Sequence, residues 1–279
     1  MGFVTRTTRA LPALVDGFRR HELLLFASAI AFQVLTAVVP LALFALGLLG
    51  FLDLTEVWRG DLRPTVADSV SPAALEIIDD TVRQVLSDRQ GFWVTTGAVL
   101  AIWQVSGAVR AAMEALNRVH EVRETRPFAA RYLRSVLLAI SGIVLILLAV
   151  AVVSVSPLLL GDLSPPAAAL ALVVRWGLAA ALLLLAVGLL VRHGPDRPQR
   201  LGWVSLGAGV VIVMWLGMSA LFGLYLTTVA SYGSLFGNLA TVVVLMGYLY
   251  ASAVTFVAGI EVDALAREEL SSTAPRSPA

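Results

Sequence analysis

The sequence predicts an all-α integral membrane protein with six transmembrane helices and one amphipathic helix outside the membrane, between the first two. Three observations support this class. Apolar residues make up 58% of the 279-residue chain, and the mean hydropathy is +0.86. Charged residues make up only 14%, whereas a soluble domain is about 25% charged. Six stretches also reach the length of about 20 apolar residues that a helix needs to cross a bilayer.

The six stretches are residues 23–52, 92–109, 136–160, 167–191, 201–229 and 235–260. We expect helices, because a lone strand cannot satisfy its backbone in lipid and the alternating pattern of a barrel is missing. The first stretch, at about 30 residues, is far longer than the 7–15-residue apolar core of a cleaved signal peptide. It contains Pro40, which removes a backbone donor and is expected to act as a kink or hinge.

The segment 53–91 is predicted to be the one sizeable loop on the outer side, with eight acidic residues against four arginines. Ser71 and Pro72 are a good helix start, and apolar residues then recur at helical spacing. This pattern predicts an amphipathic helix. It can be a structural cap on the outer helix ends, or a substrate gate or partner-docking helix.

Orientation follows from the arginines, which are the only cationic side chains besides histidine. Four lie before the first stretch, six follow the second, three follow the fourth and two lie in the tail, against four in the outer loop. Cytoplasmic segments carry the excess of positive charge, so both termini are expected in the cytoplasm. We expect a cytoplasmic segment 1–22, one transmembrane domain 23–266 and a disordered cytoplasmic tail 267–279.

Composition also excludes several classes of function. The formal net charge of +1 gives no field that would recruit nucleic acid, and the absence of cysteine excludes disulfides, cysteine-ligated zinc and iron–sulfur clusters. No metal-binding, phosphate-loop or nucleophile motif is present, so we expect no enzyme activity, no metal and no cofactor. A nuclease or hydrolase would normally need clustered carboxylates.

Three polar residues fall in the middle third of the predicted bilayer. Gln33, Gln104 and Arg175 lie roughly 15, 18 and 12 Å from the first residue of their stretches, at 1.5 Å per residue. A guanidinium at that depth costs at least about 2.5–3.5 kcal/mol, so it should face protein or water. No carboxylate stands at matching depth. The three residues are therefore candidates for lining a substrate cavity; alternatively Arg175 is satisfied locally or extends outward, and the glutamines join helices.

Charged residues at the cytoplasmic helix ends form a second candidate group. Arg110 and Glu114 have the i,i+4 spacing of a helical ion pair. The group, expected to be a framework of ion pairs or a gate that breaks and re-forms, comprises Arg110, Glu114, Asn117, Arg118, Arg126 and Glu261. Cytoplasmic arginines are also expected to touch anionic lipid headgroups.

The outer turn between the last two stretches contains Tyr232, Gly233 and Gly237. Glycine permits close backbone approach. The turn is expected to be a tight, packed connection or a short broken element that lines an entrance.

Three blocks of residues resemble the YihY/BrkB family of bacterial inner-membrane proteins, formerly misnamed ribonuclease BN. The most specific block places Asn117-Arg118 before Glu124-Thr125-Arg126-Pro127-Phe128. The other blocks are Ala29-Ile30-Ala31-Phe32 with Val39-Pro40-Leu41, and Ser231-Tyr232-Gly233 with Ala258-Gly259-Ile260-Glu261-Val262-Asp263-Ala264. Phe32 and Gly247 depart from the tyrosine and tryptophan expected there. The resemblance implies a six-helix protein of the bacterial inner membrane connected with envelope integrity.

Two functions are therefore expected from the sequence. The first is transport or flipping of an amphipathic anionic substrate such as a lipid precursor, and the alternative is a non-transporting scaffold for envelope integrity. Membrane lipids and proteins of the envelope machinery are the expected partners, with no nucleic acid. Substrate, energy coupling and oligomeric state are left open.

Overall fold

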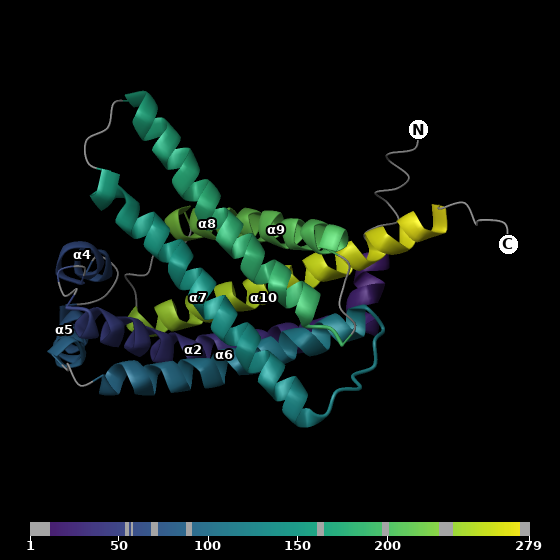
Figure 1. The fold of residues 1–279 in the computed structure, drawn as a ribbon, viewed down its shortest axis with the longest axis horizontal. Coiled ribbons are helices and arrows are strands. Elements are labelled where there is room, and N and C mark those ends of the chain that lie inside the picture. The colour runs from purple at the N-terminus through teal and green to yellow at the C-terminus, as the bar shows by residue number, and fades with distance from the viewer. Residues whose placement is uncertain are drawn as a thin grey trace.

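The computed structural model describes residues 12–53, 56, 58–67, 72–87, 91–160, 165–196, 201–228 and 237–273, and no strand occurs among them. Six long helices dominate this part of the chain (Figure 1). They are α2 (Leu23–Phe51), α6 (Phe92–Val119), α7 (Phe128–Leu160), α8 (Pro165–His193), α9 (Leu201–Thr228) and α10 (Gly237–Thr273). The predicted all-α membrane class is confirmed.

Five of these helices, α2, α6, α7, α8 and α10, are long and apolar enough to cross a membrane. Helix α9 contributes a shorter apolar stretch, Gly209–Leu224, among the residues searched. The predicted count of six spans is consistent with this set.

Several helices extend beyond the apolar stretches that predicted them. Helix α6 continues to Val119 rather than ending at residue 109, α7 begins at Phe128 rather than 136, and α10 continues to Thr273. Residues 267–273 of the tail expected to be disordered are therefore helical. The reason is that the predicted limits followed hydropathy, whereas good helix formers such as Ala, Leu, Arg and Glu continue a helix into water.

The segment between α2 and α6 contains one π-helical turn, η1 (Trp58–Leu62), and the helices α4 (Arg63–Ala67) and α5 (Pro72–Ser87). Helix α5 begins at Pro72, as predicted. It buries Val82 and Val85, and a Cβ added to Gly50 of α2 would lie 2.8 Å from the carbonyl oxygen of Leu86. The amphipathic helix α5 thus packs on the end of α2. The interpretation of α5 as a structural cap requires such a contact.

Helices α2 and α6 lie side by side and form the closest helix pair (Figure 1). A Cβ on Gly97 would lie 2.5 Å from the backbone nitrogen of Phe44, so only glycine allows this approach. Small residues at helix contacts are the usual means by which transmembrane helices pack closely.

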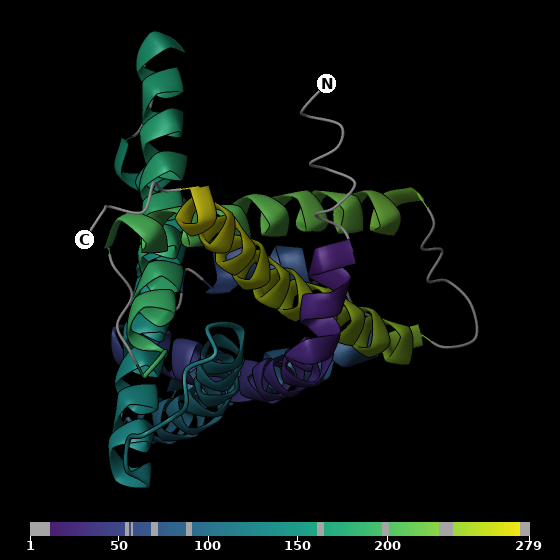
Figure 2. The same ribbon diagram turned by 90° about the vertical axis from the view of Figure 1, so that its right-hand side faces the viewer.

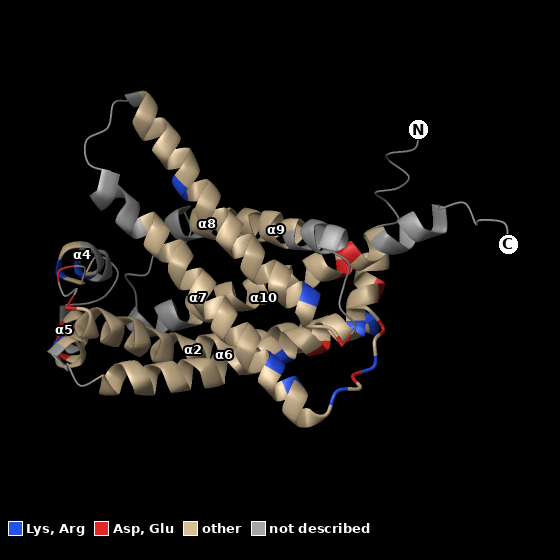
Figure 3. Ribbon diagram, viewed as in Figure 1, with Lys and Arg blue, Asp and Glu red and all other residues tan. Residues whose placement is uncertain are grey.

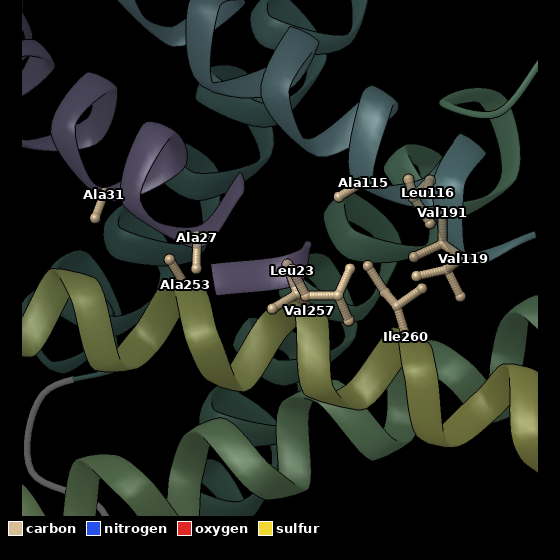
Figure 4. Close-up of a cluster of buried hydrophobic side chains, with 10 residues drawn as sticks. All are labelled: Leu23, Ala27, Ala31, Ala115, Leu116, Val119, Val191, Ala253, Val257 and Ile260. Carbon is tan, nitrogen blue, oxygen red and sulfur yellow. The ribbon is translucent and has the colours of Figure 1, made fainter. Parts of the chain in front are cut away.

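The hydrophobic core lies at the end of the bundle where α2 begins and where α6 and α8 end, which we call the arginine-rich end. Helix α10 crosses α2 there, and Figure 4 shows side chains from α2, α6, α8 and α10 pointing toward one another. The buried members are Leu23, Ala27, Ala31, Ala115, Leu116, Val119, Val191, Ala253, Val257 and Ile260. Four alanines among them let the backbones approach.

Helices α7 and α8 pack on each other beside this core, and the first half of α8 extends away from α2, α6 and α10 (Figures 1 and 2). Large apolar side chains on that half are exposed, including Leu170 and Val173. In a membrane protein such a face is covered by lipid. Figure 3 shows charged residues mainly at the two ends of the bundle, with long uncharged helix between.

Candidate functional site

Gln33 lies on α2 and Gln104 on α6, two helices that pack on each other, and both side chains are half-buried. Gln33 packs against Gly107, where an added Cβ would lie 2.6 Å from Oε1 of Gln33. Within the described ranges no hydrogen bond is recorded for either side chain. Gln33 thus packs at a close helix contact, and both interpretations of the two glutamines, as cavity lining and as residues that join helices, stay predictions.

Arg175 lies on α8, which packs chiefly on α7 and α9 rather than on the α2–α6 pair. No hydrogen bond or ion pair among the described residues joins it to either glutamine. The three residues predicted to form one layer are therefore divided between two groups of helices. Hydropathy gave their depth in the membrane but carried no information on which helices face each other.

The guanidinium of Arg175 is half-buried, and its Nε is buried without a hydrogen-bond partner in the described part of the chain. Its Cζ lies 5.7 Å from the ring centroid of Trp176, within the range of a cation–π contact. The neighbouring Val173, Val174 and Trp176 are more than half exposed. Arg175 therefore lies on a lipid-facing segment of α8, and no described carboxylate forms an ion pair with it.

Asn117, Glu124, Arg126 and Asp196 form a polar cluster at the arginine-rich end, which we call the Asn117 clamp. Asn117 is 2% exposed in the last turns of α6. Its Nδ2 donates to Oε2 of Glu124 at 2.9 Å, and its Oδ1 accepts from the backbone nitrogen of Asp196 at 2.9 Å. The side-chain amide of Asn117 thus links the segment between α6 and α7 to the segment between α8 and α9.

Arg126 supplies the charge that holds the clamp together. Its Nε and Nη2 donate to the two carboxylate oxygens of Glu124 at 2.6 and 2.7 Å, and its Nε lies 2.9 Å from Oδ1 of Asp196. Nη2 also donates to the carbonyl of Gly194 at 3.1 Å. Hydrogen bonds from the Arg126 side chain are the main reason that the pKa of Glu124 falls to about 2. The clamp joins two connections through ion pairs and hydrogen bonds, and whether it is a fixed framework or a gate that breaks and re-forms stays a prediction.

The expected ion pair between Arg110 and Glu114 is not formed. Glu114 instead accepts from Arg131 Nη2 at 2.9 Å and lies 3.6 Å from Nε of Arg118. Arg110 Nη1 donates to the hydroxyls of Ser106 and Ser135. The packing of α7 on α6 determines these partners, because it places Arg131 beside Glu114 and Ser135 beside Arg110.

Glu261, on α10 at the arginine-rich end, is 2% exposed and pairs with a histidine rather than with an arginine. Its Oε2 lies 3.1 Å from Nδ1 of His21, just before α2. Gly17 leaves room for the carboxylate, since an added Cβ would overlap its Oε1. This contact brings the N-terminal segment and α10 to the same end of the molecule.

Of the four residues predicted to form a hinge or a turn, Pro40 and Gly237 are among the described residues. Pro40 lies inside α2, which continues to Phe51, and Gly237 begins α10. Tyr232 and Gly233 lie outside the described residues.

Sequence reasoning missed Glu124, Asp196, Ser135 and Tyr132 as site residues. Glu124 stood in the block that resembles the family but was not proposed as a site residue. Asp196 follows Gly194-Pro195 in a connection rich in arginine, and this isolated acid was the available signal. Ser135 and Tyr132 gave no signal, because a serine and a tyrosine near a membrane interface are common. Among the described residues no group of three or more His, Asp or Glu could hold a metal ion.

Comparison with known proteins gives one family and one curated relative. The model of the family described as virulence factor BrkB matches residues 14–279. A protein of Bacillus subtilis (strain 168), named putative ribonuclease-like protein YfkH, is 27% identical over 262 residues, which cover 91% of this chain and 94% of that protein. No solved structure matches the chain.

Proposed function

Because the chain belongs to the BrkB family of membrane proteins, we propose that it transports or flips an amphipathic anionic molecule, such as a lipid precursor, across the bacterial cytoplasmic membrane. In this proposal both termini lie in the cytoplasm, and the arginine-rich end faces the cytoplasmic leaflet. The excess of arginine in the connections at that end supports this orientation.

The observation that carries the proposal is that the guanidinium of Arg175 has no ion-pair partner among the described residues. It lies within an apolar span, its Nε has no partner in the described part of the chain, and its neighbours on α8 are exposed. A cation at such depth costs about 2.5–3.5 kcal/mol or more without compensation. The phosphate of an amphipathic substrate would supply the missing anion while its acyl chains stay in lipid.

The test is lipid translocation by protein reconstituted into vesicles. Fluorescent phosphatidylglycerol in the inner leaflet should reach the outer leaflet faster than in empty vesicles. Arg175→Leu should remove most of this activity, and Arg175→Lys should retain part of it. Arg83→Gln, on the exposed face of α5, is the matched control and should leave the rate unchanged. Wild-type protein that moves no anionic lipid faster than empty vesicles would overturn the proposal.

A non-transporting scaffold is the second candidate, and one observation favours it. Gln33 is packed against Gly107, and two pockets that described residues form at the arginine-rich end are lined by α2, α6, α7 and the segment before α2, without Arg175. A scaffold needs no path through the bundle. Normal vesicle permeability together with specific retention of envelope proteins by the tagged chain would favour this function.

A further inference from the structure

A pocket of about 340 Å³ lies between α2, α6 and α7 near the arginine-rich end. Its lining includes Phe26 from α2, Arg110 and Glu114 from α6, and Phe128, Arg131 and Tyr132 from α7. Two guanidinium groups and one carboxylate give it a net positive charge. Aromatic side chains make up much of the remaining wall.

Two hydrogen-bond donors of Arg110, Nε and Nη2, have no partner among the described residues around this pocket. Nη1 donates to Ser106 at 3.1 Å and to Ser135 at 3.3 Å, and both serines are fully buried. The hydroxyls donate in turn to the carbonyls of Trp103 and Tyr132, so they can only accept from the arginine. Nε and Nη2 have no hydrogen bond to any described residue. These two atoms form the edge that binds a phosphate or carboxylate with two parallel hydrogen bonds.

The ring of Tyr132 holds the guanidinium in this orientation, with Cζ of Arg110 4.9 Å from the ring centroid. Fixing the side chain lowers the entropy lost when an anion binds. Arg110 is therefore arranged in advance for an anion that the protein itself does not provide.

Arg131 adds a second cation to the pocket. Its Nη2 is taken by Glu114, but its Nε is buried and lacks a partner in the described ranges. A buried donor without an acceptor costs free energy, which a bound anion would recover. Glu114 neutralises only part of the charge of the two arginines in the lining.

The rim of the pocket is apolar and faces lipid. Phe128 is 80% exposed and stacks on Tyr132 with ring centroids 6.2 Å apart, and Trp103 beside them is 61% exposed. Exposed aromatic residues at a helix end are typical of the membrane interface, where headgroups lie. A polar interior with an aromatic rim suits a molecule with an anionic head and acyl chains better than a free anion.

We propose that this pocket binds the phosphate of an anionic glycerophospholipid from the adjoining leaflet, with Arg110 as its bidentate ligand and Arg131 as a second cation. The inference rests on the proposed function for its substrate class and deepens it by adding a headgroup-binding site that is separate from Arg175. Binding here does not require transport, so each can be tested without the other.

The test is equilibrium lipid binding to the purified full-length protein in detergent, counted by native mass spectrometry. The probes are phosphatidylglycerol, zwitterionic phosphatidylcholine and soluble glycerol 3-phosphate. We expect phosphatidylglycerol to bind most tightly. Arg110→Gln should weaken it about tenfold or more, as expected for losing hydrogen bonds to a charged group. Arg110→Lys should recover only part of the affinity, because an ammonium cannot bind with two parallel bonds.

Two further variants separate the pocket from general charge. Glu114→Gln removes the competing carboxylate and should tighten phosphatidylglycerol binding several-fold, a result that a merely misfolded variant would not give. Arg123→Gln removes one exposed cation from the same end of the molecule but outside the pocket, and it should bind as the wild type does.

Equal binding of phosphatidylglycerol by the wild type and Arg110→Gln would overturn the inference. So would a loss of affinity in Arg123→Gln as large as the loss in Arg110→Gln. Tighter binding of glycerol 3-phosphate than of the lipid would identify a free-phosphate site and overturn it as well. If the lipid binds as expected but vesicles show no translocation, the pocket stands and the transport proposal fails.

Discussion

The arginine-rich end and the first half of α8 are built in opposite ways. The arginine-rich end buries Leu23, Leu116 and Ile260 together with polar side chains such as Asn117 and Glu261. The first half of α8 exposes its large apolar side chains and buries few residues. Both regions contain long apolar helix, so hydropathy alone does not show which of them is packed against protein. The comparison teaches that one end fixes the arrangement of the helices, while the other presents a surface to lipid.

The largest expected effect comes from breaking the Asn117 clamp. Arg126→Ala leaves Glu124 and Asp196 close together without their cation, and removing one partner of a buried ion pair costs about 3–5 kcal/mol. The measurement is the free energy of unfolding in mixed detergent micelles. Arg123→Ala, on an exposed residue three positions earlier, should change it by no more than about 0.5 kcal/mol. A similar fall in the free energy of unfolding in both variants would show that the ion pairs of the clamp do not stabilise the fold.

A second large effect should distinguish buried from lipid-facing leucine. Leu116→Ala removes a fully buried side chain at the contact of α6, α8 and α10, and it should cost about 2–5 kcal/mol. Leu170→Ala, at 65% exposure on α8, should cost much less in the same unfolding experiment, because few protein atoms surround it. Equal costs would mean that the first half of α8 is packed against protein in the membrane.

The clamp should also make stability depend on pH. The pKa of Glu124 is lowered to about 2 in the folded protein, so its ionised form is stabilised by folding. This contribution is fully present above the usual pKa near 4.5 and is lost as pH falls toward 2. Comparing unfolding at pH 6 and at pH 3 should show a loss in the wild type that is smaller in Glu124→Gln. An identical pH dependence in both proteins would contradict this assignment.

The smallest expected effect tests the close contact of α2 and α6. Gly97→Ala places a methyl group against the backbone of Phe44 and should cost about 1–3 kcal/mol, as overpacking does. Gly177→Ala on α8 meets no atom within 4 Å and should be neutral or slightly stabilising, because alanine favours helix more than glycine. Thermal unfolding of the two variants side by side gives the comparison. A destabilised Gly177→Ala would show that α8 has a close neighbour there.

Much of the architecture could be predicted from residues alone. Hydropathy located the long helices, and Ser71-Pro72 with its apolar repeat located α5. These features depend on local chemistry: backbone groups in lipid must be satisfied within a helix, and a helix start needs particular residues. The motif from Asn117 to Phe128 contains two predicted framework residues of the clamp, Asn117 and Arg126, but Glu124 and Asp196 were not among the candidates.

The ion pairs could not be predicted in the same way. The spacing of Arg110 and Glu114 favoured a pair on one helix, yet Glu114 pairs with Arg131 of α7, and Arg110 donates to Ser106 and to Ser135 of α7. An i,i+4 pair contributes only about 0.2–0.5 kcal/mol, so any well-placed group on a neighbouring helix can replace it. Arg175 was likewise grouped with Gln33 and Gln104 because their estimated depths in the membrane agree. The helix of Arg175, α8, packs chiefly on α7 and α9 rather than on the α2–α6 pair that carries the glutamines.

The sequence by itself determined the membrane class, the helices and the excess of arginine at one end, because each follows from the transfer of local segments between water and lipid. Only the tertiary structure decided which charges meet, that Arg175 lies apart from the glutamines, and that Arg110 keeps two donors free of described partners beside an aromatic rim. Those outcomes depend on the rotation and crossing of helices, which are set by contacts between residues far apart in the chain.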